Sequence, residues 1–163
     1  MRVRSVSFAN LTPIPGCALP DQGLALKRNW EQRRRKEGKP LATETKRANL
    51  VLGHNCQVCW EKFVRYFDVE PRFVALEEDC YTLTADKATK LVDEYTIGVC
   101  CILGSTYNGE YEDVKEINKA LLKLAVDTNT PPVPIHVDAA SGKRDLRVDT
   151  TTTRDGQRLT VGC

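Results

Sequence analysis

The sequence predicts an α/β fold in which a mainly parallel sheet is flanked by helices. Strand-like and helix-like patterns alternate along the middle of the chain, and one stretch is a continuous apolar run typical of a strand buried on both faces. Polar clusters also follow two of the predicted strands. Because ligands of parallel sheets bind beyond the carboxyl ends of the strands, these clusters are the first places to look for a site.

Composition divides the 163 residues into three segments. Residues 1–22 contain three of the eight prolines and show no lasting periodicity. Residues 143–163 are polar and include four consecutive threonines. We expect both of these end segments to be disordered, because neither offers much apolar surface to bury. Residues 23–142 remain as the folded domain.

The folded segment begins with a helical pattern at residues 24–36 that ends in the basic run 33–36. Such a run fits the solvated end of a helix, where cations complement the dipole, and a nucleic-acid patch is the alternative. A short apolar strand follows at residues 49–53. The next helix, residues 57–67, has large apolar side chains at helical spacing: Val58, Trp60, Phe63, Val64 and Phe67.

The same alternation continues through the next two elements. Residues 72–76 return to strand character. Thr84 fits the N-cap of a helix that reaches about Asp93, because a hydroxyl at this position can accept a hydrogen bond from a free backbone N–H. The chain therefore shows a second strand–helix unit directly after the first.

The last three elements complete the predicted sheet. Residues 97–103 form the continuous apolar strand, and its Cys100 and Cys101 are expected to be buried free thiols. Residues 112–126 have the apolar spacing of a helix, and residues 133–137 form the final strand. Four strands separated by helices favour right-handed crossovers and parallel pairing.

Several classes of function find little support in the sequence. The net charge of +2 gives no reason to expect nucleic acid or a membrane surface as a partner, and no apolar run approaches the ~20 residues of a membrane-spanning helix. No nucleotide-binding glycine motif is present. Cys56 and Cys59 have C-x-x-C spacing, but one pair is weak for zinc, so we predict no metal. Residues 1–20 lack the apolar core of a secretory signal, and we expect a cytoplasmic location.

The stretch His136-Val137-Asp138-Ala139-Ala140-Ser141-Gly142 is the most informative part of the sequence. An acid at the end of a buried strand, followed by small residues, leaves room for a flat ligand beside a carboxylate. The alternative is that Asp138 only caps the next turn. Gln57 and Thr106 have similar alternatives, as a polar helix start and as a hydroxyl bonded to turn backbone.

Six segments keep the order and spacing of one known family: Gly23-Leu24-Ala25-Leu26-Lys27-Arg28, Val58-Cys59-Trp60-Glu61-Lys62-Phe63 with Arg65-Tyr66-Phe67, Val92-Asp93-Glu94, Ile102-Leu103-Gly104-Ser105-Thr106, Asn108-Gly109-Glu110 and His136 to Gly142. On these segments residues 23–142 resemble glutamate decarboxylase, the plant type most closely, in the group II pyridoxal-phosphate-dependent decarboxylases. The resemblance implies that this segment is part of the large domain of a fold-type I transferase-like enzyme. It also implies a homo-oligomeric lyase that converts L-glutamate to 4-aminobutyrate and carbon dioxide with pyridoxal 5'-phosphate as cofactor.

The resemblance also implies roles for four residues. Asp138 matches the carboxylate that pairs with the pyridine nitrogen of the cofactor, and so keeps that nitrogen protonated. Ala140 matches the small residue on one face of the ring, and Gln57 matches the residue stacked on the other face. Thr106 matches a hydroxyl beside the ring substituents.

The resemblance stops at both ends of the chain. The family has a Ser-x-His-Lys segment, whose lysine holds the cofactor as a Schiff base, and a Gly-Ser-Ser phosphate-binding turn, and neither has a counterpart in this sequence. The family continues with Gly and Phe where this chain has Lys143 and Arg144. We therefore expect no catalytic lysine in this chain and no activity of the chain alone. The alternative function is a non-catalytic fragment that at most binds full-length subunits.

Overall fold

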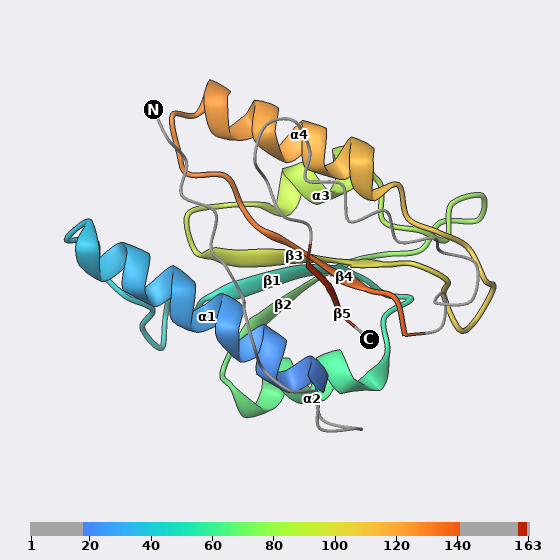
Figure 1. Ribbon diagram of the computed structural model, residues 1–163, viewed down its shortest axis with the longest axis horizontal. Helices are drawn as coiled ribbons and strands as arrows, with labels where there is room; N and C mark the ends of the chain where they lie inside the picture. The colour runs from blue at the N-terminus through green and yellow to red at the C-terminus, as the bar shows by residue number, and fades with distance from the viewer. Residues whose placement is uncertain (1–17, 141–159, 163) are drawn as a thin grey trace.

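The computed structural model describes residues 18–140 and 160–162, with side chains for residues 22–140. Within this part, five strands form one parallel sheet in the order β2-β1-β3-β4-β5, with helices on both faces (Figure 1). The strands are β1 (Asn49–Gly53), β2 (Glu70–Val74), β3 (Thr96–Ile102), β4 (Ile135–Asp138) and β5 (Thr160–Gly162). The helices are α1 (Ala18–Lys36), α2 (Val58–Tyr66), α3 (Ala85–Leu91) and α4 (Val114–Asp127). The predicted α/β class is confirmed.

The helices divide into two pairs, one on each face of the sheet. Helices α1 and α2 cover one face and α3 and α4 cover the other (Figure 1). Adjacent side chains of β1 point to opposite faces of the sheet. Leu50 and Leu52 pack in the α1–α2 core, while Val51 packs in the α3–α4 core. This alternation follows from the period of two along a strand and makes every residue of β1 buried.

Each predicted helix and strand is present, although several boundaries move. The strand at Asn49–Gly53 has its predicted bounds, and Thr84 is the N-cap of α3. Cys100 and Cys101 are buried free thiols, as predicted. Helix α4 begins later than predicted, because Asp113 is its N-cap and accepts a hydrogen bond from the backbone N–H of Glu116.

The two end segments are only partly described. Helix α1 starts at Ala18, within residues 1–22, and β5 lies within residues 143–163, so both segments contain regular structure where we expected none. Pairing with β5 satisfies backbone groups along the edge of β4, which supplies a physical reason for a strand there. Residues 1–17 and 141–159, with Ser141 and Gly142 of the site motif, lie outside the described residues.

The basic run at the end of α1 is not a uniformly solvated surface. Arg34 is only 4% exposed, and its guanidinium lies over the rings of Trp30 and Tyr95, at 5.0 and 4.8 Å from their centroids. It also donates a hydrogen bond of 3.1 Å to the carbonyl oxygen of Glu94. The prediction of a solvated run is therefore wrong for Arg34, which joins α1 to the segment before β3.

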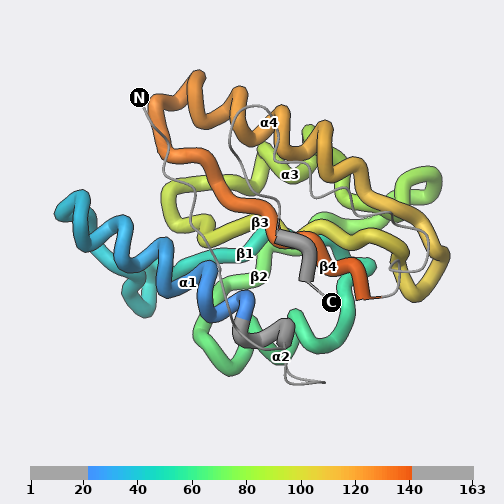
Figure 2. The backbone as a smooth tube through the Cα atoms, in the orientation of Figure 1, coloured from blue at the N-terminus to red at the C-terminus, as the bar shows by residue number. Residues whose placement is uncertain are grey.

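The parallel strands direct their connecting loops to one edge of the sheet. The chain leaves β3 and β4 on the same side of the molecule, where it also leaves β1 (Figure 2). The residues after these three strands therefore meet at the carboxyl edge. Among the described helices, none is long and apolar enough to cross a membrane.

Candidate functional site

The loops after β1, β3 and β4 enclose a small cavity at the carboxyl edge of the sheet. Its volume is about 10 Å³, which is room for roughly one water molecule. The cavity is lined by Asn55, Gln57, Ile102, Gly104, Thr106, Asp138 and Ala140. All four residues singled out in the sequence are in this set, although they come from three loops that lie far apart in the chain.

Asp138 ends β4 and places a buried carboxylate at the cavity. Its side chain is 3% exposed, and its Oδ2 accepts a hydrogen bond of 3.0 Å from the indole Nε1 of Trp60. Its Oδ1 accepts a bond of 3.2 Å from the backbone N–H of Ala140, so part of the turn-capping alternative is also realised. No ion pair to Asp138 is found among the side chains of residues 22–140. A buried anion without a cation favours a positively charged ligand at this position.

His136 lies two residues before Asp138 but does not supply that missing cation. Burial lowers the pKa of His136 to about 4, against an opposing effect of Asp138, so its imidazole is neutral near pH 7. The ring lies 5.0 Å from the Trp60 ring, and its buried Nε2 has no hydrogen-bond partner in the described structure. Asp138 therefore faces the cavity with neutral donors only.

Gln57 and Thr106 approach each other across the mouth of the cavity. Gln57 is the N-cap of α2, yet its side chain makes no capping bond and instead donates through Nε2 to the hydroxyl of Thr106. This bond joins the loop after β1 to the loop after β3, which neither local alternative for these residues predicts. Gly104 has a φ of 79°, a conformation that glycine adopts without strain, and so lets the second loop turn towards the cavity.

Trp60 is the first functional side chain that sequence reasoning missed. Its spacing with Phe63 and Val64 identified it only as a core residue, and it is fully buried. A buried indole needs an acceptor for its N–H, which was the available signal. The acceptor itself lies 78 residues later in the chain and cannot be found from local pattern.

Glu112 and Asn55 are the other two missed residues. Glu112 was taken as the first residue of a helix, but it is 3% exposed and its carboxylate accepts from the Asn55 side chain at 3.1 Å. No feature of the sequence distinguishes it from an ordinary acid at a helix start. Its neighbour Asp113 is the N-cap of α4.

The cysteines near the cavity are unsuited to nucleophilic chemistry. Burial raises the pKa of the Cys56 thiol to about 12, and the pKa of Cys59 is raised by the same cause. Burial also raises the pKa of Cys100 well above its usual value. Protonated thiols are poor nucleophiles and poor metal ligands. Among the described residues, no group of three or more His, Cys, Asp or Glu side chains could hold a metal ion.

A larger cavity of about 210 Å³ lies away from these residues, between α1 and α4. Its lining includes Trp30, Arg34, Leu121 and Pro131, and none of the residues predicted for the site. The small cavity at the carboxyl edge therefore remains the candidate site, because the buried acid and the polar side chains of three loops converge there.

The sequence is similar to known decarboxylases over most of its length. Residues 21–146 match the family model described as the pyridoxal-dependent decarboxylase conserved domain. Glutamate decarboxylase 2 of Arabidopsis thaliana is 55% identical over 122 residues, which cover 74% of this chain and 23% of that protein. Glutamate decarboxylase of Lactococcus lactis is 43% identical over 120 residues, which cover 74% of this chain and 25% of that protein.

Solved structures agree with the sequence comparison. Lactobacillus brevis glutamate decarboxylase superposes with a TM-score of 0.70 at 38% identity, covering 77% of this chain and 28% of that one. Oryza sativa TDC with PLP and tryptamine has a TM-score of 0.57 at 15% identity, covering 74% and 26%, and shows the fold alone. The chain thus spans about a quarter of the length of the curated relatives it matches.

Proposed function

The chain belongs to the pyridoxal-dependent decarboxylase family, and from this premise we propose that the whole protein is a glutamate decarboxylase. The reaction removes the α-carboxyl group of L-glutamate as carbon dioxide and leaves 4-aminobutyrate, with pyridoxal 5'-phosphate as cofactor. The choice of L-glutamate is supported by the glutamate decarboxylases among the relatives. The observation that carries the proposal is the meeting of Asp138, Ala140, Gln57 and Thr106 at one cavity.

The residues at the cavity fit the pyridine ring of this cofactor in their chemistry. Asp138 is a buried carboxylate without a cation among the described side chains, and a protonated ring nitrogen is a cation of matching kind. Ala140 adds no bulk beyond a methyl group. The present volume of about 10 Å³ is too small for a ring, so we infer that Gln57 gives up its bond to Thr106 when the ring enters.

When bound, pyridoxal phosphate supplies a conjugated ring that accepts the electron pair released as the carboxyl group leaves. Asp138 holds a proton on the ring nitrogen, because an adjacent buried anion raises the pKa of that base. Trp60 orients Asp138 through its indole N–H. With the cofactor bound, Gln57 and Ala140 would flank the ring and keep water from its faces, while the Thr106 hydroxyl would offer a hydrogen bond to a ring substituent.

Among the described residues, the cavity supplies binding and orientation but no covalent anchor. None of its seven lining residues is a lysine, and the family reaction uses a lysine to hold the cofactor. We therefore expect the 163-residue chain to bind the cofactor ring without turning over L-glutamate. This expectation favours the second candidate function, a non-catalytic chain that at most binds full-length subunits.

Two further parts of the proposal concern the whole protein. We infer a homo-oligomer, supported by the family resemblance, and analytical ultracentrifugation of the full-length protein would test it. We also infer a cytoplasmic location, which cell fractionation followed by detection of the protein would test.

The binding test uses pyridoxamine 5'-phosphate, which carries the same ring nitrogen and phosphate but has no aldehyde to react with surface lysines. Equilibrium dialysis against the full chain measures its dissociation constant. The variant Asp138→Asn is expected to bind about 10- to 100-fold more weakly, because a hydrogen bond to a charged group contributes about 1.5–3 kcal/mol. The exposed variant Asp113→Asn keeps an N-cap oxygen on α4 and serves as the control.

Two outcomes would contradict the proposal. Equal affinity of the parent chain and Asp138→Asn would show that the acid does not contact the ring. Absence of binding to the parent chain would remove the cofactor site altogether. A parallel assay of glutamate-dependent carbon dioxide release decides the second candidate, since release abolished by Asp138→Ala would show that the chain is catalytic by itself.

A further inference from the structure

Glu112 is a buried acid with contacts that its position at the start of a helix does not explain. Its side chain is 3% exposed, and its two oxygens accept hydrogen bonds from three separate segments. Oε2 accepts from the backbone N–H of Ile102 at 2.7 Å. Oε1 accepts from the backbone N–H of Leu83 at 3.1 Å and from the Asn55 side chain at 3.1 Å. One carboxylate therefore joins the end of β3, the loop before α3 and the loop after β1.

The charge environment of Glu112 is as unusual as its burial. No ion pair to it is found among the side chains of residues 22–140. Burial raises the pKa of its carboxyl group, while the donors from Ile102, Leu83 and Asn55 act in the opposite direction. Burying an acid is unfavourable unless fixed donors surround it, so this arrangement depends on all three segments staying in place.

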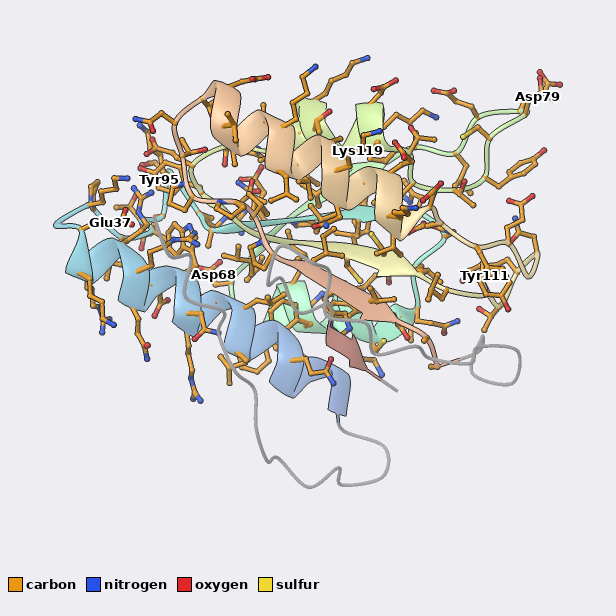
Figure 3. All side chains as sticks on the ribbon, turned by 45° about the horizontal axis from the view of Figure 1, so that its top comes forward. Glu37, Asp68, Asp79, Tyr95, Tyr111 and Lys119 are labelled. Carbon is orange, nitrogen blue, oxygen red and sulfur yellow. The ribbon has the colours of Figure 1, made fainter. Side chains whose placement is uncertain are left out.

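Two of these segments are walls of the candidate site. Asn55 and Ile102 both line the cavity, and they lie two residues before Gln57 and Gly104 respectively. The backbone N–H of Glu112 also donates to the carbonyl oxygen of Ile102 at 3.1 Å, so the link to β3 is made in both directions. Tyr111, next to Glu112, and Asp79, in the loop before α3, lie at the same end of the molecule (Figure 3).

The glycine at the end of β1 is an independent sign that this contact is specific. A Cβ atom on Gly53 would lie 2.2 Å from Oδ1 of Asn55 and 3.4 Å from Oε1 of Glu112. A side chain at this position would force the Asn55 side chain, which donates to the Glu112 carboxylate, to shift. Gly53 therefore provides the space in which Asn55 folds back over the strand end.

We propose that Glu112 is the positioning residue of the cofactor pocket. By holding Asn55 and Ile102 on one carboxylate, it sets the gap between the two walls of the pocket, which are the loop after β1 with Gln57 and the loop after β3 with Thr106. The proposal rests on the proposed function for the identity of the ligand. The clamp itself, meaning the hydrogen bonds from Asn55, Leu83 and Ile102 to the Glu112 carboxylate, is a property of the ligand-free protein. The two can therefore be tested separately.

The test compares Glu112→Gln and Asn55→Ala with two controls in the full chain. Glu112→Gln turns one acceptor into an NH₂ donor, and Asn55→Ala removes only the hydrogen bond from Asn55 while the bond from Ile102 remains. Glu110→Gln removes an exposed charge from the same loop, and Ile117→Val removes a buried methyl group of α4 that does not line the cavity. All measurements are made at a temperature where far-ultraviolet circular dichroism shows every variant folded.

The first readout is amide hydrogen exchange without ligand, followed by nuclear magnetic resonance. We expect the amides of Ile102 and Leu83 to exchange at least 10-fold faster in Glu112→Gln and to be unchanged in Glu110→Gln. Unchanged protection of both amides in Glu112→Gln would overturn the clamp, whatever the chain binds.

The second readout is the binding of pyridoxamine 5'-phosphate, with the circular dichroism band induced in the bound ring. Glu112→Gln and Asn55→Ala are expected to bind at least 10-fold more weakly and to change the induced band, because both alter the gap between the walls. Ile117→Val should bind within twofold of the parent chain even though it loses stability. Equal loss of affinity in Ile117→Val would reduce Glu112 to a general structural residue and overturn the positioning role. Absence of binding to the parent chain, with exchange behaving as expected, would instead overturn the proposed function.

Discussion

Replacing Trp60 with phenylalanine tests how the site holds its acid. The change keeps an aromatic ring in the core but removes the N–H that donates to Oδ2 of Asp138 at 3.0 Å. Trp30 offers a matched control, because it is also buried and donates its indole N–H to the carbonyl oxygen of Glu94 at 3.2 Å. Both variants therefore lose an indole and one hydrogen bond, to a carboxylate in one case and to a carbonyl oxygen in the other. Phenylalanine at position 30 keeps an aromatic face for the guanidinium of Arg34, which lies over the Trp30 ring.

The two variants should lose different amounts of stability, because Trp60 donates to the Asp138 carboxylate and Trp30 donates to a backbone carbonyl oxygen. A bond to a charged group contributes about 1.5–3 kcal/mol and a neutral bond about 0.5–1.5 kcal/mol. The smaller ring leaves a void in each case, at a cost of ~24 cal/mol per Å³ that largely cancels between the two variants. We therefore expect Trp60→Phe to lower the free energy of unfolding by about 1–2 kcal/mol more than Trp30→Phe.

Urea unfolding followed by circular dichroism measures this difference, and equilibrium dialysis measures the dissociation constant for pyridoxamine 5'-phosphate. Trp60→Phe should bind the ligand roughly 10-fold more weakly, since about 1.4 kcal/mol corresponds to tenfold. Trp30→Phe should bind as the parent chain does, because Trp30 does not line the cavity. Equal losses of stability in the two variants, with affinity retained in Trp60→Phe, would refute the view that Trp60 orients Asp138.

Two further predictions concern buried groups beside the site. Burial lowers the folded-state pKa of His136 from 6.5 to about 4, so the folded chain resists a protonation that the unfolded chain accepts. Up to about 3 kcal/mol of stability should therefore be lost as the pH falls from 6.5 to about 4. Urea unfolding at several pH values should show this slope, and His136→Asn should flatten it; an unchanged slope would contradict the assignment. Because burial raises the pKa of Cys56 to about 12, we expect its thiol to resist iodoacetamide at pH 8 in the folded chain and to react in urea. Mass spectrometry of peptides checks this, and rapid labelling of Cys56 before unfolding would disprove it.

Much of the fold could be predicted because its elements have local periodicity. The strand at Asn49–Gly53 and the N-cap at Thr84 follow from apolar spacing and capping chemistry, which act over a few residues. Helix boundaries were less secure, since α4 was predicted to begin at residue 112 and instead begins at Val114, with Asp113 as its N-cap. The burial of Arg34 could not be predicted, since its aromatic partner Tyr95 belongs to a distant segment.

The candidate site was predictable only in part. From the residues alone, Asp138, Gln57 and Thr106 each had a local alternative, and the family resemblance was needed to select them together. The structure brings them to one cavity and shows that Gln57 bonds to Thr106 rather than capping its own helix. Their contact with the cofactor stays a prediction.

The sequence by itself determined the alternation of strands and helices, the family, and the buried acid at the end of a strand. Each of these depends only on neighbouring residues or on a motif. Only the tertiary structure decided that Trp60 holds that acid and that Glu112 joins the walls of the cavity. Parallel strands bring residues from distant loops to one edge of the sheet, and the partner of a buried polar group is fixed there by proximity in space.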